Sequence, residues 1–193
     1  MVLLISFLAG CEEDKTNLIY ELKKPDDLSE EVYEVYSRII DNKFGKQEYI
    51  VLQQETDTTV HEDHCHRLYE DETTDLDSTT MINYLQKNHN SYNLGTHFET
   101  NPEIKLITQE ELTTYKLDTK KGWESFHKNY PKAEGVLYFT FPGFNDGHSR
   151  ALFEYTWHTG EDQSEYYLMY LKKAEEAWQI LVHEQITENG ASH

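Results

Sequence analysis

The chain has 193 residues, and its 36 acidic side chains outnumber 17 lysines and arginines, which gives a formal net charge of −19. Such an acidic chain repels phosphate backbones, so we expect no nucleic-acid partner. The length suits one domain of ordinary size, and an aromatic fraction of 13% supplies large side chains for its core.

An uncharged apolar run, Val2 to Gly10, is nine residues long. A bilayer-spanning helix takes about 20 apolar residues, so this run is too short to cross a membrane. Its length suits the hydrophobic region of a secretory signal, and the small residues Ala9 and Gly10 suit a cleavage site. The alternative is a buried N-terminal strand. We expect residues 1–10 to be a signal peptide.

The stretch Leu8-Ala9-Gly10-Cys11 resembles the lipobox of bacterial lipoproteins. The resemblance implies that Cys11 carries the lipid at the start of the mature chain and that residues 11–27 form a tether. Two or more acyl chains hold a protein stably on a membrane. The acidic run Glu12-Glu13-Asp14 resembles the surface-export signal of Bacteroidota lipoproteins, but it could equally just keep a tether solvated. We expect a lipid-anchored protein of the bacterial outer membrane or cell surface, with the membrane as its partner through Cys11.

Residues 28–188 are expected to form a single domain, because no internal repeat or Gly/Ser-rich linker divides them. Asp27-Leu28-Ser29-Glu30 resembles a capping box with Asp27 as the N-cap, and it predicts a first helix that stops at Gly45. The apolar stripe of this helix consists of Val32, Val35, Tyr36, Ile39 and Ile40. A short strand is expected over Tyr49–Gln54.

The segment from 55 to 80 is the least apolar part of the chain, and a helix containing Met81 is expected to start at Ser78 or Thr79. Further elements are then expected as a short strand at Ile104–Ile107, a helix cap at Thr108-Gln109-Glu110-Glu111 and a short helix from Trp123 to Tyr130.

The last third of the chain predicts four consecutive strands, near residues 135–141, 151–158, 166–171 and 178–186. Asn145-Asp146-Gly147 is a strong hairpin turn between the first two. Short connections indicate an antiparallel meander. Since helices precede it, the expected class is α+β, with N-terminal helices packed on one face of a curved antiparallel sheet. This order of elements is similar to NTF2-like folds.

Several motifs are similar to those of an uncharacterised family of exported Bacteroidota-type proteins. They lie within roughly residues 28–54 and 121–186 and include Gly122-Trp123-Glu124-Ser125-Phe126, Tyr130-Pro131-Lys132-Ala133-Glu134-Gly135, Phe144-Asn145-Asp146-Gly147, Ala151-Leu152, Tyr166-Tyr167-Leu168 and Trp178. The chain departs from the family pattern at the turn 159–164 and at residues 174–177. The resemblance implies export with a lipoprotein signal and supplies no catalytic residue.

One cluster has side chains suited to a metal: His61, His64, Cys65 and His66. Imidazole and thiolate bind zinc and related ions, and His61 and His64 would share a face of a helix. The spacing lacks two separated ligand pairs, so a solvated polar loop is the competing interpretation. Cys65 also has the residue types of a nucleophile beside a base, without a recognisable motif. With Cys11 lipidated, Cys65 would have no disulfide partner.

Glu154 and His158 share one side of a predicted strand. They could line a pocket if the sheet curls, but the wet face of an antiparallel sheet is the preferred interpretation. The aromatic rows are expected to be core or cross-strand pairs. The sequence thus predicts a lipid-anchored, acidic, non-catalytic protein that binds an unidentified protein or small molecule. The alternative is an envelope metal-binding protein that uses residues 61–66. An enzyme with a pocket in an NTF2-like cone is the third and least favoured interpretation.

Overall fold

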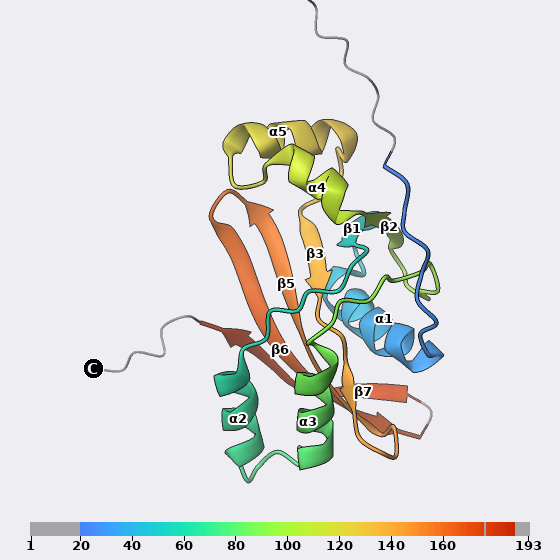
Figure 1. Ribbon diagram of the computed structural model, residues 1–193, viewed down its shortest axis with the longest axis vertical. Helices are drawn as coiled ribbons and strands as arrows, with labels where there is room; N and C mark the ends of the chain where they lie inside the picture. Colours follow the sequence, from blue (N-terminus) through green and yellow to red (C-terminus); the bar gives the residue numbers. More distant parts are fainter. Residues whose placement is uncertain (1–19, 176, 188–193) are drawn as a thin grey trace, which may run out of the picture.

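The computed structural model describes residues 20–175 and 177–187 (Figure 1). Its helices are α1 (Glu30–Phe44), α2 (Glu62–Glu70), α3 (Ser78–Lys87), α4 (Gln109–Tyr115) and α5 (Lys120–Asn129). Its strands are β1 (Tyr49–Gln53), β2 (Glu103–Ile107), β3 (Val136–Phe139), β4 (Gly143–Phe144), β5 (Arg150–Gly160), β6 (Gln163–Ala174) and β7 (Ala177–Ile186). None of the described helices combines the length and the apolar character that crossing a bilayer requires. The expected signal peptide and Cys11 lie outside the described residues.

The described strands form one mixed sheet in the order β2-β1-β3-β5-β6-β7, with β4 paired to β5. Antiparallel pairing of β3, β5, β6 and β7 confirms the predicted meander and the α+β class. Strand β1 instead pairs in parallel with both β2 and β3. The sheet is therefore not wholly antiparallel, because a short apolar run indicates a strand without fixing the direction of its neighbours.

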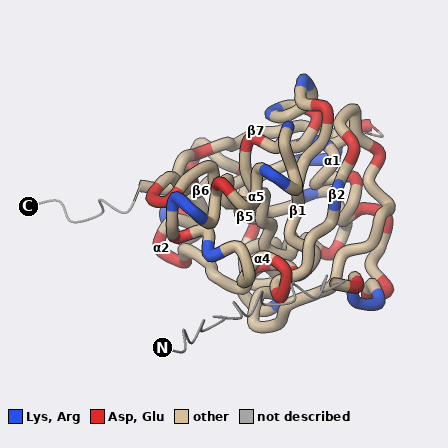
Figure 2. The backbone as a smooth tube through the Cα atoms, turned by 90° about the horizontal axis from the view of Figure 1, so that it is seen from above, with Lys and Arg blue, Asp and Glu red and all other residues tan. Residues whose placement is uncertain are grey.

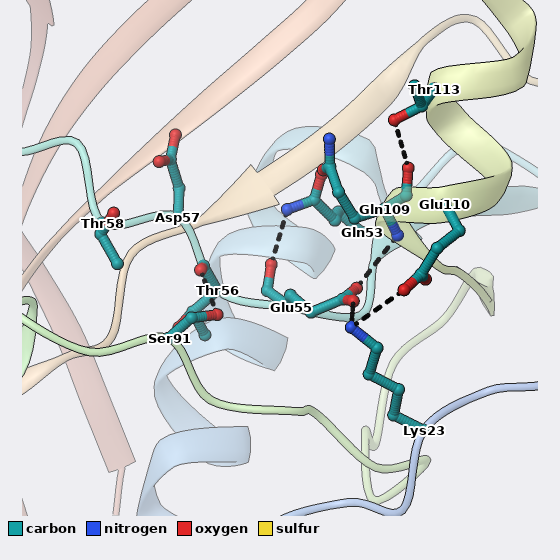
Figure 3. A pocket seen from close by; sticks show the side chains of 10 residues that line it. All are labelled: Lys23, Gln53, Glu55, Thr56, Asp57, Thr58, Ser91, Gln109, Glu110 and Thr113. Atoms are coloured by element: carbon teal, nitrogen blue, oxygen red, sulfur yellow. Dashed lines mark hydrogen bonds and ion pairs between the residues drawn. The ribbon is translucent and has the colours of Figure 1, made fainter.

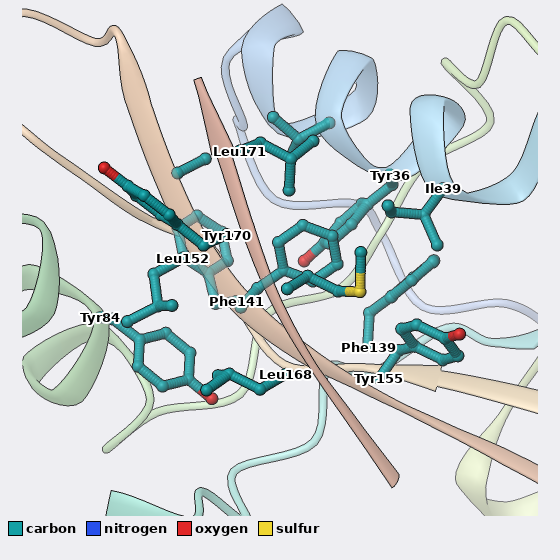
Figure 4. Packing of buried hydrophobic residues seen from close by; sticks show 14 of the residues in the cluster. Tyr36, Ile39, Tyr84, Phe139, Phe141, Leu152, Tyr155, Leu168, Tyr170 and Leu171 are labelled. Atoms are coloured by element: carbon teal, nitrogen blue, oxygen red, sulfur yellow. The ribbon is translucent and has the colours of Figure 1, made fainter. Parts of the chain in front are cut away.

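Helix α1 covers one face of the sheet with the apolar stripe that the sequence predicts. The Tyr36 ring stacks on Phe139 with 4.2 Å between centroids, among the buried side chains of Figure 4. The Tyr36 hydroxyl donates to the backbone oxygen of Thr140 at 2.8 Å, so its polar atom is satisfied inside the core.

Only the C-terminal end of α1 lies where the sequence predicts it. Gly45 is the C-cap, as expected, but the N-cap is Ser29 and not Asp27. The chain before the helix is held elsewhere, because the Asp26 backbone N–H donates to the Asn93 backbone oxygen at 2.9 Å. Asp27 therefore lies in irregular chain two residues before the cap.

The opposite face of the sheet is covered by two helix pairs, so the expectation that helices lie on one face was incomplete. Helices α4 and α5 lie over the end near β1 and β3, while α2 and α3 lie over the other end (Figure 1). Residues 54–61 cross the sheet between the two pairs, where the Asp57 N–H donates to the Phe139 backbone oxygen at 2.8 Å.

This cover corrects the prediction of a wet face at Glu154, whose exposed fraction is only 4%. His158, four residues further along the same strand, is half-buried and packs edge-on against Trp123 of α5, with 5.1 Å between ring centroids. Alternation along β5 indicates which residues share a face, but it does not indicate what covers that face. The predicted core role of the aromatic rows is confirmed, since Tyr155, Trp157 and Tyr170 are buried.

Candidate functional site

The histidine-rich segment forms helix α2, with His61 as its N-cap. The helix buries only Cys65 and Leu68, one turn apart on one side. His66 is exposed. Two buried residues in nine give a weak apolar signal, which explains why polarity concealed this helix in the sequence.

Helix α2 brings His61 and Cys65 to the same buried carboxylate, that of Glu154. The His61 backbone N–H donates to Glu154 Oε1 at 3.0 Å, and His61 Nδ1 lies 2.6 Å from Oε2. The Cys65 thiol lies 3.9 Å from Oε1. Burial, and then the negative charge of Glu154, raise the pKa of Cys65 far above its usual value, so it remains a thiol. A buried neutral thiol lacks the thiolate that a cysteine nucleophile needs.

The remaining predicted ligands point to other neighbours. His64 Nδ1 lies 3.8 Å from Glu184 Oε1, and burial followed by the charge of Arg67 lowers the pKa of His64. Within residues 20–175 and 177–187, no group of three or more His, Cys, Asp or Glu side chains is arranged to hold a metal ion. The structure thus joins His61 and Cys65 through Glu154, and it does not bring His61, His64, Cys65 and His66 to a common point.

The space beside Glu154 is too small for a ligand. The cavity bordered by His61, Thr156 and Tyr166 has a volume of about 10 Å³, at the limit for one water molecule. The His61–Glu154–Cys65 cluster is therefore a structural connection between α2 and the sheet.

A larger cavity, of about 580 Å³, lies where the parallel strands β1 and β2 end (Figure 3). Open sheets place ligands in the crevice outside the carboxyl ends of their parallel strands. We call this space the carboxyl-edge cavity; its lining residues are Lys23, Gln53, Glu55, Thr56, Asp57, Thr58, Ser91, Gln109, Glu110 and Thr113.

Local structure on both sides positions these side chains. Strand β1 ends at Gln53, and the chain continues along the cavity through Glu55 and Asp57. On the other side, the Thr108 hydroxyl accepts a hydrogen bond from the Glu111 N–H and caps α4, as the sequence predicts. This cap places Gln109 and Glu110 at the cavity.

Lys23 supplies the only cation among the lining residues. Its Nζ lies 2.6 Å from Glu55 Oε1 and 3.3 Å from Glu110 Oε1, as drawn in Figure 3. The hydrogen bond to Glu55 and its charge raise the pKa of Lys23. The pKa of Glu110 is lowered by its own backbone N–H and by Lys23.

The backbone of Lys23 is also attached to the domain. Its N–H donates to Gln54 Oε1 at 2.8 Å, and its carbonyl accepts from Gln54 Nε2 at 2.7 Å. Part of the segment expected as a tether therefore lies against the folded domain at the cavity.

Gln53 is a buried amide among the residues that line the cavity. Its exposed fraction is 7%, and its Nε2 donates to the Glu55 backbone oxygen at 2.8 Å. Its Oε1 is buried and has no hydrogen-bond partner among the described residues. A buried acceptor without a partner is costly, so this atom favours a donor.

A second groove, of about 760 Å³, lies between α1 and residues 96–99. Its polar groups already hold the chain together: the Tyr33 hydroxyl accepts from the Gly95 N–H at 2.9 Å, and the Ser37 hydroxyl accepts from the Glu99 N–H at 3.2 Å. These contacts indicate that the groove is a packing boundary between α1 and the segment 95–99.

Figure 2 shows Asp and Glu spread along much of the backbone, with fewer Lys and Arg among them. The acidic character is thus general, while the carboxyl-edge cavity concentrates carboxylates around one ammonium. No sequence pattern predicts this cavity, because its lining residues come from four distant segments.

No family model matches the sequence, and no curated protein or solved structure matches it either. The residues and their geometry are therefore the basis for inferring a function. The NTF2-like comparison remains a prediction.

Proposed function

We propose that this chain is a lipid-anchored protein of the bacterial cell envelope that binds a small polar ligand in the carboxyl-edge cavity without chemical conversion. Cys11 would carry the lipid, on the outer membrane or the cell surface. This part of the proposal is supported by the lipobox-like sequence before Cys11 and the acidic run after it.

The observation that carries the binding role is the carboxyl-edge cavity itself. Its volume of about 580 Å³ lies in the range of small-molecule sites, about 300–1,000 Å³. Its lining holds neither histidine nor cysteine, and the Ser91 hydroxyl donates to the Thr56 backbone oxygen at 2.8 Å. Nucleophilic catalysis needs a nucleophile next to a base, and this lining supplies hydrogen-bonding groups instead.

The anchor is tested by expressing the chain in a bacterium with Cys11 or with Cys11→Ser. Mass spectrometry of the mature N-terminus should find an acylated Cys11 in the first, and fractionation should move the variant out of the membrane. Retention of the intact Met1 peptide in both proteins would defeat the anchor.

The binding role is tested separately on the soluble Cys11→Ser protein. Neutral, cationic and anionic small molecules are titrated while the backbone amide resonances are followed by NMR. At least one class should shift the amides of residues 55–58 and 109–113 together. Shifts confined to other regions, or none at all, would contradict binding in this cavity.

A further inference from the structure

We propose that the carboxyl-edge cavity binds the primary ammonium group of a small aliphatic amine, and that Lys23 competes for this position from within the chain. The inference rests on the proposed function and names its ligand class.

The charges of the lining favour a cation. Glu55, Asp57 and Glu110 bring three carboxylates to the cavity, and Lys23 is the single ammonium opposite them. The Asp57 Oδ1 atom accepts from the Thr59 N–H at 2.9 Å, and no Lys or Arg of the described residues forms an ion pair with this carboxylate. The cavity therefore carries an excess of negative charge, which attracts a positively charged ligand.

Gln53 favours a second donor on the same ligand, because its Oε1 atom receives no bond from the Lys23 Nζ that lies between Glu55 and Glu110. Its Oε1 atom is an acceptor without a described partner, and an ammonium group offers three N–H donors and no acceptor. A ligand of acceptors alone would leave this oxygen unsatisfied. Hydroxyl groups of Thr58 and Thr113 add further acceptors around the space.

The geometry favours an organic cation over a metal ion. The three carboxylates do not converge, since no described group of His, Cys, Asp or Glu could hold a metal. The cavity volume of about 580 Å³ also far exceeds the share of one water-sized particle, about 30 Å³. A chain of methylene groups with a terminal ammonium fills such a space, as the Lys23 side chain does in part.

Lys23 shows where the ammonium would lie, between Glu55 and Glu110. The Lys23 side chain is 45% exposed, so an incoming amine can reach and replace its ammonium beside Glu55, whose side chain is only 11% exposed. A tethered group has a local concentration of about millimolar magnitude, so Lys23 would weaken the apparent affinity for a free amine.

The test titrates 1,5-diaminopentane into the soluble protein by calorimetry, with NMR to locate the site. Lys23→Met should bind the diamine about tenfold more tightly than the parent, because the internal competitor is gone. Lys24→Met is the matched control, since it removes the same charge from the neighbouring exposed residue, and it should behave like the parent. Equal affinities in the two variants would overturn the role of Lys23.

The carboxylates are tested in the Lys23→Met background. Adding Glu110→Gln should weaken diamine binding, while adding Glu124→Gln on the exposed side of α5 should not. A second probe is lysine with an acetylated α-amino group and an amidated carboxyl group. It distinguishes recognition of a lysine side chain from recognition of a free diamine.

Titration with neutral glucose distinguishes an error in the ligand class from an error in the binding role of the cavity. If glucose shifts the cavity amides of Lys23→Met and the amines do not, the ligand class is wrong but the cavity still binds a small molecule. If neutral, cationic and anionic probes all leave these amides unchanged, both the ligand class and the binding role are wrong.

Discussion

His61 and Glu154 are joined twice, through the backbone N–H of His61 at 3.0 Å and through its ring Nδ1 at 2.6 Å. The carboxylate comes from β5 and the histidine begins α2, so both contacts attach the helix to the sheet. Because α2 buries only two of its residues, this polar attachment is a large part of what holds the helix in place.

Glu154→Gln tests this attachment. The substitution keeps the shape but removes the charge, and it turns one acceptor into a donor that faces another donor. We expect the free energy of unfolding to fall by about 2–3 kcal/mol, as for hydrogen bonds to charged groups. Urea denaturation followed by circular dichroism measures this change. Glu161→Gln, in the exposed turn after β5, is the control, and equal midpoints for the two variants would refute the attachment.

Cys65 should be unreactive while the protein is folded. It is fully buried, and burial together with Glu154 keeps the thiol protonated by raising its pKa. In the Cys11→Ser protein, where Cys65 is the only cysteine, Ellman's reagent should label it at the rate of unfolding, and rapidly in urea. Fast labelling of the native protein would show an accessible thiolate.

Stability should decrease on acidification because of His183. Burial and the nearby Lys43 ammonium lower the pKa of His183 from 6.5 to about 4. Between these values the unfolded chain binds more protons than the folded one, so the free energy of unfolding falls as the pH falls from about 6.5 to about 4.

His183→Gln removes this titration and keeps an acceptor near the Tyr155 hydroxyl, which lies 2.9 Å from His183 Nε2. Melting temperatures should depend less on pH in this variant, with a residual slope from His158 and His64, whose pKa values burial also lowers. His89→Gln, at an exposed position, should keep the slope of the parent. A parental slope in His183→Gln would contradict the assignment.

Gly143 allows β4 to approach α3. A Cβ atom at this position would lie 2.2 Å from the Tyr84 backbone N, so Gly143→Ala forces the two elements apart. We expect a loss of about 1–3 kcal/mol in the free energy of unfolding, as for other overpacked sites. At Gly147 an added Cβ meets only the Ser149 hydroxyl, at 3.9 Å. Gly147→Ala should therefore be much milder, and thermal denaturation compares the two.

Much of the local structure could be predicted from sequence, because its causes are local. The Thr108 cap, the stripe of α1 and the alternation of the last strands each depend on neighbouring residues. Asp27 failed as a cap because Asp26 is bonded to a residue far along the chain, Asn93. Long-range contacts of this kind leave no pattern in a single sequence.

The same reason explains what was missed at the sites. Glu154 was expected to face water, and its burial depends on helices that precede β5 by many residues. Lys23 and Glu110 are far apart in the sequence and meet at the ends of the parallel strands. Of the predicted metal ligands, His61 and Cys65 do come together, but through Glu154, which the sequence did not associate with them.

The parallel pairing of β1 with β2 also has a kinetic consequence. Tyr49 pairs with Glu103 across a long intervening segment, whereas β5, β6 and β7 are joined by short turns. Contacts between distant residues form slowly, since a large loop must close before they stabilise the chain. We therefore expect the meander to fold first and the carboxyl-edge cavity to be completed last, so that a chain refolding from denaturant has a sheet before it has a binding site.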